Sequence, residues 1–481
     1  MRLRGALVVA VAAAGVAIAG PAIGAGGRGD SAVHNVSRTP SLAEGEEFIA
    51  VNPRNPANVI VGSNQFVPIA GPNSFPVSRR GLVNCAVWSS HDGGRSWRGG
   101  TISAPGSVPD EAGIDPQQIH GADQSIVFDR RGTAYFMCQH LSLDPPDFRL
   151  LLWRSTDGGR TWQPPTVAFS SSEANLYNHD RPFLVIDQTG GPRDGTLYLS
   201  WETMFFQPYL PRVDMRSSRD GGRTWSATSR VDAEGPLRAM WDPRQMPAVG
   251  ADGSLNIVYA ASPYASTFPN DPNAEKITLV HARSTDGGLT FTRTVVDDSV
   301  NRVSSPDEGG SDVDELISAI AADPRRRGRI AVAWPDDRSG EARILLRHSE
   351  DSGRTWSAPV DVSDDPRGRG NQHDHIALAY LPDGRLLAVW RDRRATGGSW
   401  DSPYDVFGRT FAIGRGRRFR AGEVTRITQH SATPTSGKRG VMPSEYLGLA
   451  VGRDGVSVSW DELVNGIGDN LFRRMPLSAF R

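Results

Sequence analysis

Carboxylate, arginine and tyrosine side chains in this sequence cluster at the ends of short apolar segments, and together they could cleave a glycosidic bond. That reaction needs an acid to protonate the leaving oxygen and a second group to attack or stabilise the cationic sugar. Arginines can bind a substrate carboxylate through paired, charge-assisted hydrogen bonds. The candidate catalytic residues are Tyr446, Glu202, Glu315, Asp123 and Asp180, and the candidate substrate-binding residues are Arg181, Arg338 and Arg391.

The same positions also have a structural explanation. The acids stand before or after segments with the pattern of β-strands, so each could fix a turn by accepting hydrogen bonds from backbone amides. The arginines could form ion pairs on the surface or between elements. Tyr446 could pack its ring at the mouth of a channel. Both explanations depend on how the strands are arranged.

A pair of apolar strands joined by a short turn recurs along the chain. Several of the second strands end alike, with Trp followed at once or after one residue by an acid, as in Trp201-Glu202 and Trp390-Arg391-Asp392. The copies span residues 48–62, 124–138, 182–201, 246–259, 316–334, 376–390 and 447–460. Short strands at regular spacing indicate an all-β fold.

An octet of the form Ser-x-Asp-x-Gly-x-Thr-Trp follows the strand pairs. Its short Asp side chain can accept hydrogen bonds from turn amides, and its glycines can adopt positive φ. Each octet is therefore predicted to join two antiparallel strands. The good copies are Ser90–Trp97, Ser155–Trp162, Ser218–Trp225, Ser284–Phe291 and Ser349–Trp356, and a worn copy spans Ala412–Phe419.

The octets recur about every 64 residues, which is the size of a four-stranded propeller blade. The chain after about residue 30 has room for about seven such units. The last unit has two strands and a third candidate, Asn470–Arg474, but no fourth. The segment Val33–Arg38 resembles the departing strands of other units and could fill that place. We predict a β-propeller of seven four-stranded antiparallel blades closed by this N-terminal strand, with six blades as the alternative.

The position of the turns separates two faces of the propeller. In an antiparallel blade, the turns between first and second strands lie at the same end as those between third and fourth strands. The octets are therefore predicted at the bottom. The residues before each first strand and after each second strand lie at the top, where the candidate catalytic and substrate-binding residues would surround the channel mouth.

The octet resembles the Asp box, or BNR repeat, of the sialidase superfamily of β-propellers, and the resemblance covers nearly the whole chain after the N-terminal segment. It implies that the octets are structural turns remote from the active site. Asp boxes also occur in glucan-cleaving glycosidases and in non-enzymatic receptors, so the resemblance indicates the fold more strongly than the function. The catalytic sialidases are six-bladed, and a seventh blade would be a departure from them.

The segment Tyr446–Asp461 resembles the sialidase region that carries a catalytic tyrosine. In sialidases a tyrosine replaces the nucleophilic carboxylate, and a neutral phenol avoids repulsion by the carboxylate of the substrate. The segment His375–Asp392 has the same pattern with His in place of Tyr, so the match can also reflect a pattern common to all blades.

Taken as a sialidase, the chain would be a retaining exo-α-sialidase. Tyr446 would be the nucleophile, with Glu202 or Glu315 activating it and Asp123 or Asp180 as the acid. Sialidases also carry an Arg-x-Pro motif at the first blade. This chain has Glu46-Glu47-Phe48-Ile49-Ala50 there, and Arg181-Pro182 is only a loose substitute, which brings the arginine clamp and sialic acid as the substrate into question.

Composition excludes several other classes. The 481 residues include 53 Lys and Arg against 54 Asp and Glu, so no basic field favours nucleic acid. A hydrophobic fraction of 38% with aromatic residues throughout argues against a disordered chain or a coiled coil. We expect a monomer whose partner is a glycan and which requires no cofactor.

Metal sites are weakly indicated. His373 and His375 flank Asp374, but two nitrogen ligands alone make a poor site. The acidic loop around Asp312, Asp314 and Glu315 could hold Ca²⁺ as a structural ion, although a solvated acidic loop explains it as well.

The first residues have the pattern of a secretory signal, with Arg2 and Arg4 before an apolar run and small residues after it. We predict a signal peptide at 1–25, a linker at 26–32, one propeller domain at 33–481 and a secreted protein. An uncleaved membrane anchor is the alternative, and no later segment has the pattern of a membrane span. Cys85 and Cys138 could form a disulfide in an oxidising compartment, and the sequence leaves their pairing open.

Two functions fit these observations. The first is a secreted sialidase-like glycoside hydrolase acting on glycans at the top face. The second is a non-catalytic propeller that binds glycan or protein partners there.

Overall fold

The chain divides into two units in a computed structural model, residues 1–30 and residues 31–481, and only the second is described below. The described residues are 32–38, 43–66, 83–102, 118–143, 146–171, 176–205, 211–240, 243–262, 276–301, 303–305, 313–314, 317–396, 398, 402–414, 419–434 and 446–481. The predicted signal peptide lies outside them. Within these ranges, no helix has the length and apolar character needed to cross a membrane.

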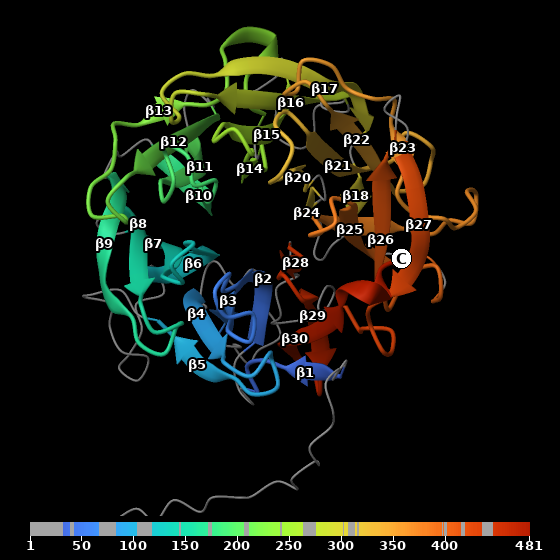
Figure 1. Cartoon of the computed structure of the whole chain (residues 1–481), viewed down its shortest axis with the longest axis horizontal. Helices are drawn as coiled ribbons and strands as arrows, with labels where there is room; N and C mark the ends of the chain where they lie inside the picture. Colours follow the sequence, from blue (N-terminus) through green and yellow to red (C-terminus); the bar gives the residue numbers. More distant parts are fainter. Residues whose placement is uncertain are drawn as a thin grey trace, which may run out of the picture. The chain divides into compact units, whose positions relative to one another are not determined.

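The described strands form seven four-stranded antiparallel sheets, which radiate from a common centre (Figure 1). The protein is a seven-bladed β-propeller, as predicted. In each of the first six blades the strands run in chain order from the centre outward. The six blades are β2 (Ala43–Val51) to β5 (Arg98–Thr101), β6 (Gln118–Phe128) to β9 (Gln163–Ser171), β10 (Leu176–Ile186) to β13 (Ser229–Arg230), β14 (Met246–Val249) to β17 (Thr292–Asn301), β20 (Ala319–Ala322) to β23 (Val360–Asp361), and β24 (His373–Tyr380) to β27 (Phe419–Arg426).

The middle strands of these blades carry most of the core. The second strands are β3 (Val59–Phe66), β7 (Ala134–Leu143), β11 (Leu197–Phe205), β15 (Leu255–Ala261), β21 (Ile330–Asp336) and β25 (Leu386–Asp392). The third strands are β4 (Val83–Ser90), β8 (Pro146–Ser155), β12 (Arg212–Ser218), β16 (Lys276–Ser284), β22 (Arg343–Ser349) and β26 (Asp405–Ile413). A two-stranded ribbon, β18 (Ser304–Ser305) with β19 (Val313–Asp314), and two short 3₁₀ turns, Gly235–Leu237 and Leu477–Ala479, complete the described elements.

The seventh blade joins the two ends of the described chain. It contains β28 (Gly448–Val451), β29 (Gly455–Val464) and β30 (Ile467–Pro476), and its outer strand is β1 (Val33–Asn35). Val33 pairs with Arg473 and Asn35 pairs with Leu471, so β1 lies beside β30 at the rim (Figure 1). The predicted closure by an N-terminal strand is confirmed.

Burial decreases from the middle of each blade outward. Every residue of β15, β21 and β25 is buried, because neighbouring blades cover both faces of these strands. This explains why the second strands are almost continuously apolar. The outer strands β5 and β27 are largely exposed.

Four tryptophans lie deepest in the core, one in each of four second strands. They are Trp201, Trp334, Trp390 and Trp460, all with at most 1% of their surface exposed. The indole N–H groups of Trp334 and Trp390 donate to the carboxylates of Asp336 and Asp392, at 2.9 and 3.0 Å. The acid two residues after these tryptophans therefore has a structural role.

Each well-preserved octet forms the turn between a third and a fourth strand, as predicted. In the second blade Asp157 Oδ1 accepts the backbone N–H groups of Arg160 and Thr161, both at 3.0 Å. The Ser155 hydroxyl donates to Asp157 Oδ1 at 2.8 Å and accepts the N–H of Gly159 at 2.9 Å. Burial acts to raise the pKa of Asp157, but hydrogen bonds from Thr161, Ser155 and Arg160 outweigh it and lower the pKa to about 2.

The second glycine of the octet also sets the distance between blades. A Cβ atom at Gly222 would stand 2.0 Å from a side-chain carbon of Leu152 in the preceding blade. At Gly353 it would stand 2.2 Å from His281 of the preceding blade. Both glycines have a φ near +80°, so conformation and close packing each require glycine here.

Replacing Asp157 with Ala should lower the free energy of unfolding by about 1 kcal/mol, because the turn loses its acceptor for several hydrogen bonds. Chemical denaturation would measure the change. Asp157→Asn, which keeps one side-chain carbonyl oxygen, should lose less. Unchanged stability in Asp157→Ala, combined with loss of glycan binding, would show that the octets belong to a functional face.

Candidate functional site

In five blades, a non-glycine residue in the left-handed conformation lies within the first strand or just before it. Each lies two residues before the position where regular pairing with the second strand begins, at Phe48, Ser125, Phe183, Met246 and Ala377. Non-glycine residues rarely adopt this conformation, and it concentrates at functional sites. The five residues are Glu46, Asp123, Arg181, Arg244 and His375, with φ between 47° and 63°. We call them the mouth ring.

Side chains of the following blade hold the carbonyl groups of this ring. Gln124 Nε2 donates to the carbonyl of Glu46, and Gln245 Nε2 donates to the carbonyl of Arg181 at 2.8 Å. Both glutamines are buried and directly follow a ring residue in their own blade. The same contact therefore recurs between different pairs of blades.

The N–H groups of the ring are held from the preceding blade. Asn64 Oδ1 accepts the backbone N–H of Asp123 at 2.9 Å, and Glu202 Oε1 accepts that of Arg244 at 2.7 Å. Asn64 and Glu202 occupy equivalent positions, two residues beyond the second-strand partner of Phe48 or Phe183. The surrounding structure thus fixes the unusual backbone conformation from both sides.

Tyr446 takes the place of a mouth-ring residue in the seventh blade, two residues before Gly448. Its hydroxyl accepts a hydrogen bond from Arg181 Nη1 at 2.8 Å. Arg181 Nε in turn lies 3.7 Å from Glu202 Oε1. Tyr446, Arg181 and Glu202 are 6%, 9% and 0% exposed, so three predicted site residues from two blades form one buried polar chain.

An apolar cluster surrounds the ring of Tyr446. The ring centroids of Phe48 and Phe183 lie 5.0 and 5.7 Å from it, and Ile317 and Met246 complete the cluster. A cavity of about 140 Å³ lies beside it. Its polar lining residues are Glu47, His375 and Tyr446, so one predicted catalytic group borders a cavity at the centre of the propeller.

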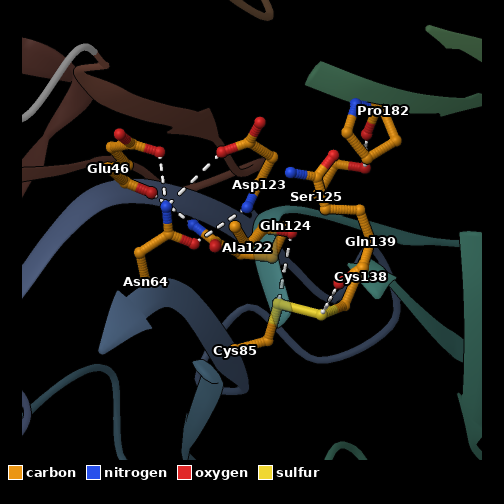
Figure 2. The surroundings of a disulfide bond; sticks show 10 residues. All are labelled: Glu46, Asn64, Cys85, Ala122, Asp123, Gln124, Ser125, Cys138, Gln139 and Pro182. Carbon is orange, nitrogen blue, oxygen red and sulfur yellow. Dashed lines mark hydrogen bonds between the residues drawn. A yellow bond between two sulfur atoms is a disulfide. The ribbon is translucent and has the colours of Figure 1, made fainter. Parts of the chain in front are cut away.

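Two carboxylates of the mouth ring share one amide nitrogen (Figure 2). Asn64 Nδ2 lies 2.6 Å from Glu46 Oε2 and 3.4 Å from Asp123 Oδ1. The amide of Asn64 therefore brings the two carboxylates close together. Glu46 was not among the predicted catalytic residues, whereas Asp123 was.

The two predicted acids both contact Arg181. Its backbone N–H donates to Asp123 Oδ2 at 3.2 Å and to Asp180 Oδ1 at 3.0 Å. Asp123 and Asp180 therefore lie on the same side of Arg181, next to the polar chain that ends at Tyr446.

A disulfide joins the first two blades beside Asp123 (Figure 2). Cys85 in β4 and Cys138 in β7 are bonded, with their Cα atoms 6.3 Å apart. The sulfur of Cys85 lies 3.5 Å from the carbonyl oxygen of Ala122, the residue before Asp123. A Cβ on Gly121 would stand 2.8 Å from the sulfur of Cys138, so the bridge packs tightly under this bulge.

Arg391 lies in a buried network of charged residues around Asp374. It contacts Asp374 Oδ1 at 2.7 Å and Asp461 Oδ1 at 3.4 Å, and its guanidinium stands 4.8 Å from the ring centroid of Tyr404. Desolvation acts to raise the pKa of Asp374, but Arg391, Arg393 and His375 outweigh it and hold the pKa well below its usual range.

Arg338 is bound at the end of β21. It contacts both carboxylate oxygens of Asp336, at 2.8 and 2.5 Å, and Asp297 at 3.1 Å. Its side chain remains 30% exposed. Carboxylates of the protein itself thus bind both Arg338 and Arg391. Glu315 lies outside the described residues, as do the side chains of the predicted Ca²⁺ loop.

Asp365, His373 and Asp392 place ligand atoms within 4.8 Å of one another, in the arrangement of a metal site. His373 Nε2 lies 3.2 Å from Asp365 and 3.1 Å from Asp392, and its Nδ1 lies 2.8 Å from the carbonyl of Ala342. Burial acts to lower the pKa of His373, but hydrogen bonds to Asp365 and Asp392 outweigh it and raise the pKa to about 9. The imidazolium of His373 is thus paired with both carboxylates of the cluster. His375 belongs to the mouth ring instead.

Sequence reasoning placed Glu46, Arg244, His375 and Asn64 near the channel mouth without selecting them. The first three stand two residues before the residue that opens regular pairing in the first strand, as Arg181 does. That position is defined by the strand register, which the sequence alone does not give.

The model of the family described as BNR repeat-like domain matches residues 151–396, slightly more than half of the chain. No curated protein matches the chain.

Several solved structures are similar in fold. A protein of unknown function from Dyadobacter fermentans is 14% identical, with a TM-score of 0.48 over 93% of this chain and 98% of that one. A mutant of NanB sialidase from Streptococcus pneumoniae is 12% identical, with a TM-score of 0.46 over 94% of this chain and 71% of that one. An α-L-arabinofuranosidase from Fusarium graminearum, in complex with arabinobiose, is 16% identical, with a TM-score of 0.45 over 77% of this chain and 96% of that one.

Removing the disulfide in the double variant Cys85→Ser, Cys138→Ser should lower the free energy of unfolding by about 4 kcal/mol. The reason is that the bridge closes a loop with a sequence separation of 53 residues. Denaturation in urea would measure the change. If reduction of the native protein left the denaturation midpoint unchanged, the bridge would contribute nothing to stability.

Stability should also fall at alkaline pH. The pKa of His373 is raised from 6.5 to about 9 in the folded protein, so its contribution is complete below pH 6.5 and is lost as the pH rises through 9. The shift corresponds to roughly 3 kcal/mol. Unfolding curves between pH 6 and 10 would measure it, and His373→Gln should flatten the dependence. A wild-type curve as flat as that of His373→Gln would contradict a charged His373.

Proposed function

Because the chain belongs to the family of BNR repeat-like domains, within the sialidase superfamily, we propose that it is a sialidase-like glycoside hydrolase acting at the mouth ring. The observation that carries the proposal is the hydrogen bond between Arg181 and the hydroxyl of Tyr446. It joins a nucleophile to a positive charge in a buried place beside a cavity, where such contacts are strongest.

In the proposed first step, the phenol oxygen of Tyr446 attacks the anomeric carbon and its proton leaves. The guanidinium of Arg181, 2.8 Å away, stabilises the negative charge that develops on that oxygen. Glu202 Oε1 lies 3.7 Å from Arg181 Nε. We assign Glu202 as the acceptor of the phenol proton. The bond from the anomeric carbon to the leaving oxygen breaks as the new bond forms.

Asp123 or Asp180 would protonate the leaving oxygen. Both carboxylates accept a hydrogen bond from the backbone N–H of Arg181. The side chain of the same arginine bonds to Tyr446. In the second step the same carboxylate takes a proton from water, whose oxygen attacks the anomeric carbon of the glycosyl-tyrosine. The bond from that carbon to the oxygen of Tyr446 breaks, and the phenolate takes its proton back from Glu202. Two displacements at one carbon retain its configuration.

A sialoside is the proposed substrate, recognised through its carboxylate. Arg181 is the predicted clamp residue next to Tyr446, and Arg244 is its equivalent in the next blade, held by the same Glu202. Arg338 and Arg391 would have to exchange contacts with Asp336 and Asp374 for contacts with the substrate. We further propose a secreted monomer without a required cofactor. The disulfide supports an oxidising location.

A non-catalytic glycan-binding propeller is the second candidate. The observation that favours it is the saturation of Arg338 and Arg391 by carboxylates of the protein itself. A mouth ring that recognises sugar hydroxyls needs neither a complete arginine clamp nor a nucleophile.

Tyr446→Phe should lower turnover of a fluorogenic sialoside by several orders of magnitude and change KM little, because nucleophilic attack is lost while the binding groups remain. Steady-state kinetics would measure both constants. Tyr259→Phe is the matched control, because it removes another buried hydroxyl, bonded to the carbonyl of Leu237 away from the mouth ring.

Full activity in Tyr446→Phe would exclude the proposed mechanism. A wild-type protein that is inactive on every sialoside tested, but binds glycans in a manner abolished by Arg181→Ala, would support the second candidate.

A further inference from the structure

We propose a second saccharide-binding site, on the outer side of the propeller between the first and second blades. A groove of about 610 Å³ opens there, between the outer strand β5 and the octet turn of the second blade. Its lining includes Arg98, Gly100, Gly159, Arg160 and Trp162. None of its lining residues belongs to the mouth ring, so this site is independent of the proposed active site.

Elsewhere in the propeller, a threonine hydroxyl fills the equivalent space between an outer strand and the octet turn of the next blade. Thr166 in the outer strand of the second blade donates to the carbonyl of Gly222, in the octet of the third blade, at 2.7 Å. Thr294 in the fourth blade donates to the carbonyl of Gly353, in the octet of the fifth blade, also at 2.7 Å. The fold thus uses a hydroxyl to satisfy the carbonyl of the second octet glycine.

The first blade lacks this hydroxyl. Gly100 pairs with Val87 just as Thr166 pairs with Leu152 and Thr294 pairs with His281. A Cβ built on Gly100 would have no atom within 4 Å, so the place of the threonine side chain is open space.

The neighbouring octet is correspondingly more exposed. Its second glycine, Gly159, is partly exposed, whereas the four equivalent glycines of the other well-preserved octets are buried. In the described part of the chain, no hydroxyl donates to the carbonyl of Gly159. Since Val87 is also smaller than Leu152 or His281, the groove extends inward from the open position.

The exposed groups match the chemistry of a sugar. A ligand hydroxyl in the open position can donate to Gly159 as the threonines do elsewhere. The half-buried ring of Trp162 offers a flat surface for the C–H face of a pyranose or furanose. The guanidinium groups of Arg98 and Arg160 can donate to the oxygens of the ligand.

The remaining polar groups of the lining do not compete for these roles. The carboxylate of Asp92 accepts hydrogen bonds from the backbone and hydroxyl of Ser96 in its own octet. Burial, followed by the charge of Arg160, lowers the pKa of His91, so its imidazole is neutral and adds no charge. The groove therefore offers donors, the carbonyl of Gly159 as an acceptor and an aromatic face, which together favour a polyhydroxylated ligand.

Such a site would act together with the mouth ring on polymeric glycans. Two sites on one rigid domain raise the effective concentration of a long ligand at either site. Short oligosaccharides would gain nothing from the groove.

Affinity electrophoresis in gels containing mucin, arabinan, galactan or xylan tests the proposal, with every variant made in the Tyr446→Phe background so that no polymer is cleaved. We expect retardation by at least one polysaccharide. Trp162→Ala should weaken the apparent Kd at least tenfold. The matched control is Trp225→Ala, because Trp225 is the octet tryptophan of the third blade, where the hydroxyl of Thr166 closes the equivalent place.

Arg98→Ala is the second variant. The side chain of Arg98 is exposed, so its removal should leave the denaturation midpoint unchanged. The apparent Kd should weaken at least threefold. Equal retardation of Trp162→Ala and Trp225→Ala, or no retardation by any of the four polysaccharides, would overturn the proposal. A wild-type protein that does not hydrolyse sialosides would contradict only the function proposed for the mouth ring, since binding at the groove does not require turnover.

Discussion

The packing of each blade against two neighbours is the constraint from which the rest of the structure follows. A four-stranded sheet with both faces apolar has no stable place at the edge of an assembly, so the ring of blades must close. In this chain the closure uses the N-terminal strand Val33–Asn35, which pairs with β30. The pairing uses two segments far apart in the sequence and covers the free edge of the last blade. The second octet glycines serve the same constraint, because each allows a neighbouring side chain to approach more closely than a Cβ would permit.

The mouth ring is a consequence of the same packing. A left-handed, non-glycine residue costs on the order of 1 kcal/mol or more and persists only where its surroundings determine it. Here side chains of adjacent blades hold both the N–H and the carbonyl groups of ring residues. The blades bring the polar residues together, and the hydrogen bonds between blades also fix the backbone conformation of these residues. That rigidity is what a site for bond cleavage needs.

Much of this could be predicted from the sequence because it repeats. The octets, the paired strands and the missing last strand each gave a signal that local hydrogen bonding and strand geometry explain, and they led to the seven blades, the closure and the position of the turns. Tyr446, Glu202, Arg181 and Asp123 were selected as site residues and lie in contact in the structure, while their roles stay predictions. The ion-pair partners of the arginines could not be predicted from the sequence. Arg338 and Arg391 have the same residue type and strand position as a clamp would require, yet Asp336 and Asp374 bind them, and no local pattern distinguishes an arginine that awaits a ligand from one that is already paired.

The groove between the first two blades shows the converse case, in which a departure from the repeat indicates a candidate site. Gly100 is unremarkable as a residue of an exposed outer strand, and only the equivalent threonines of the second and fourth blades show what is missing. Identifying the equivalent position required the strand register, because the outer strands differ in length and sequence. Repetition thus defines the structural role of a position, and a departure at that position frees backbone and aromatic groups that the other blades use for their own contacts. In a propeller, sites outside the channel can arise in this way without any change to the strands that form the core.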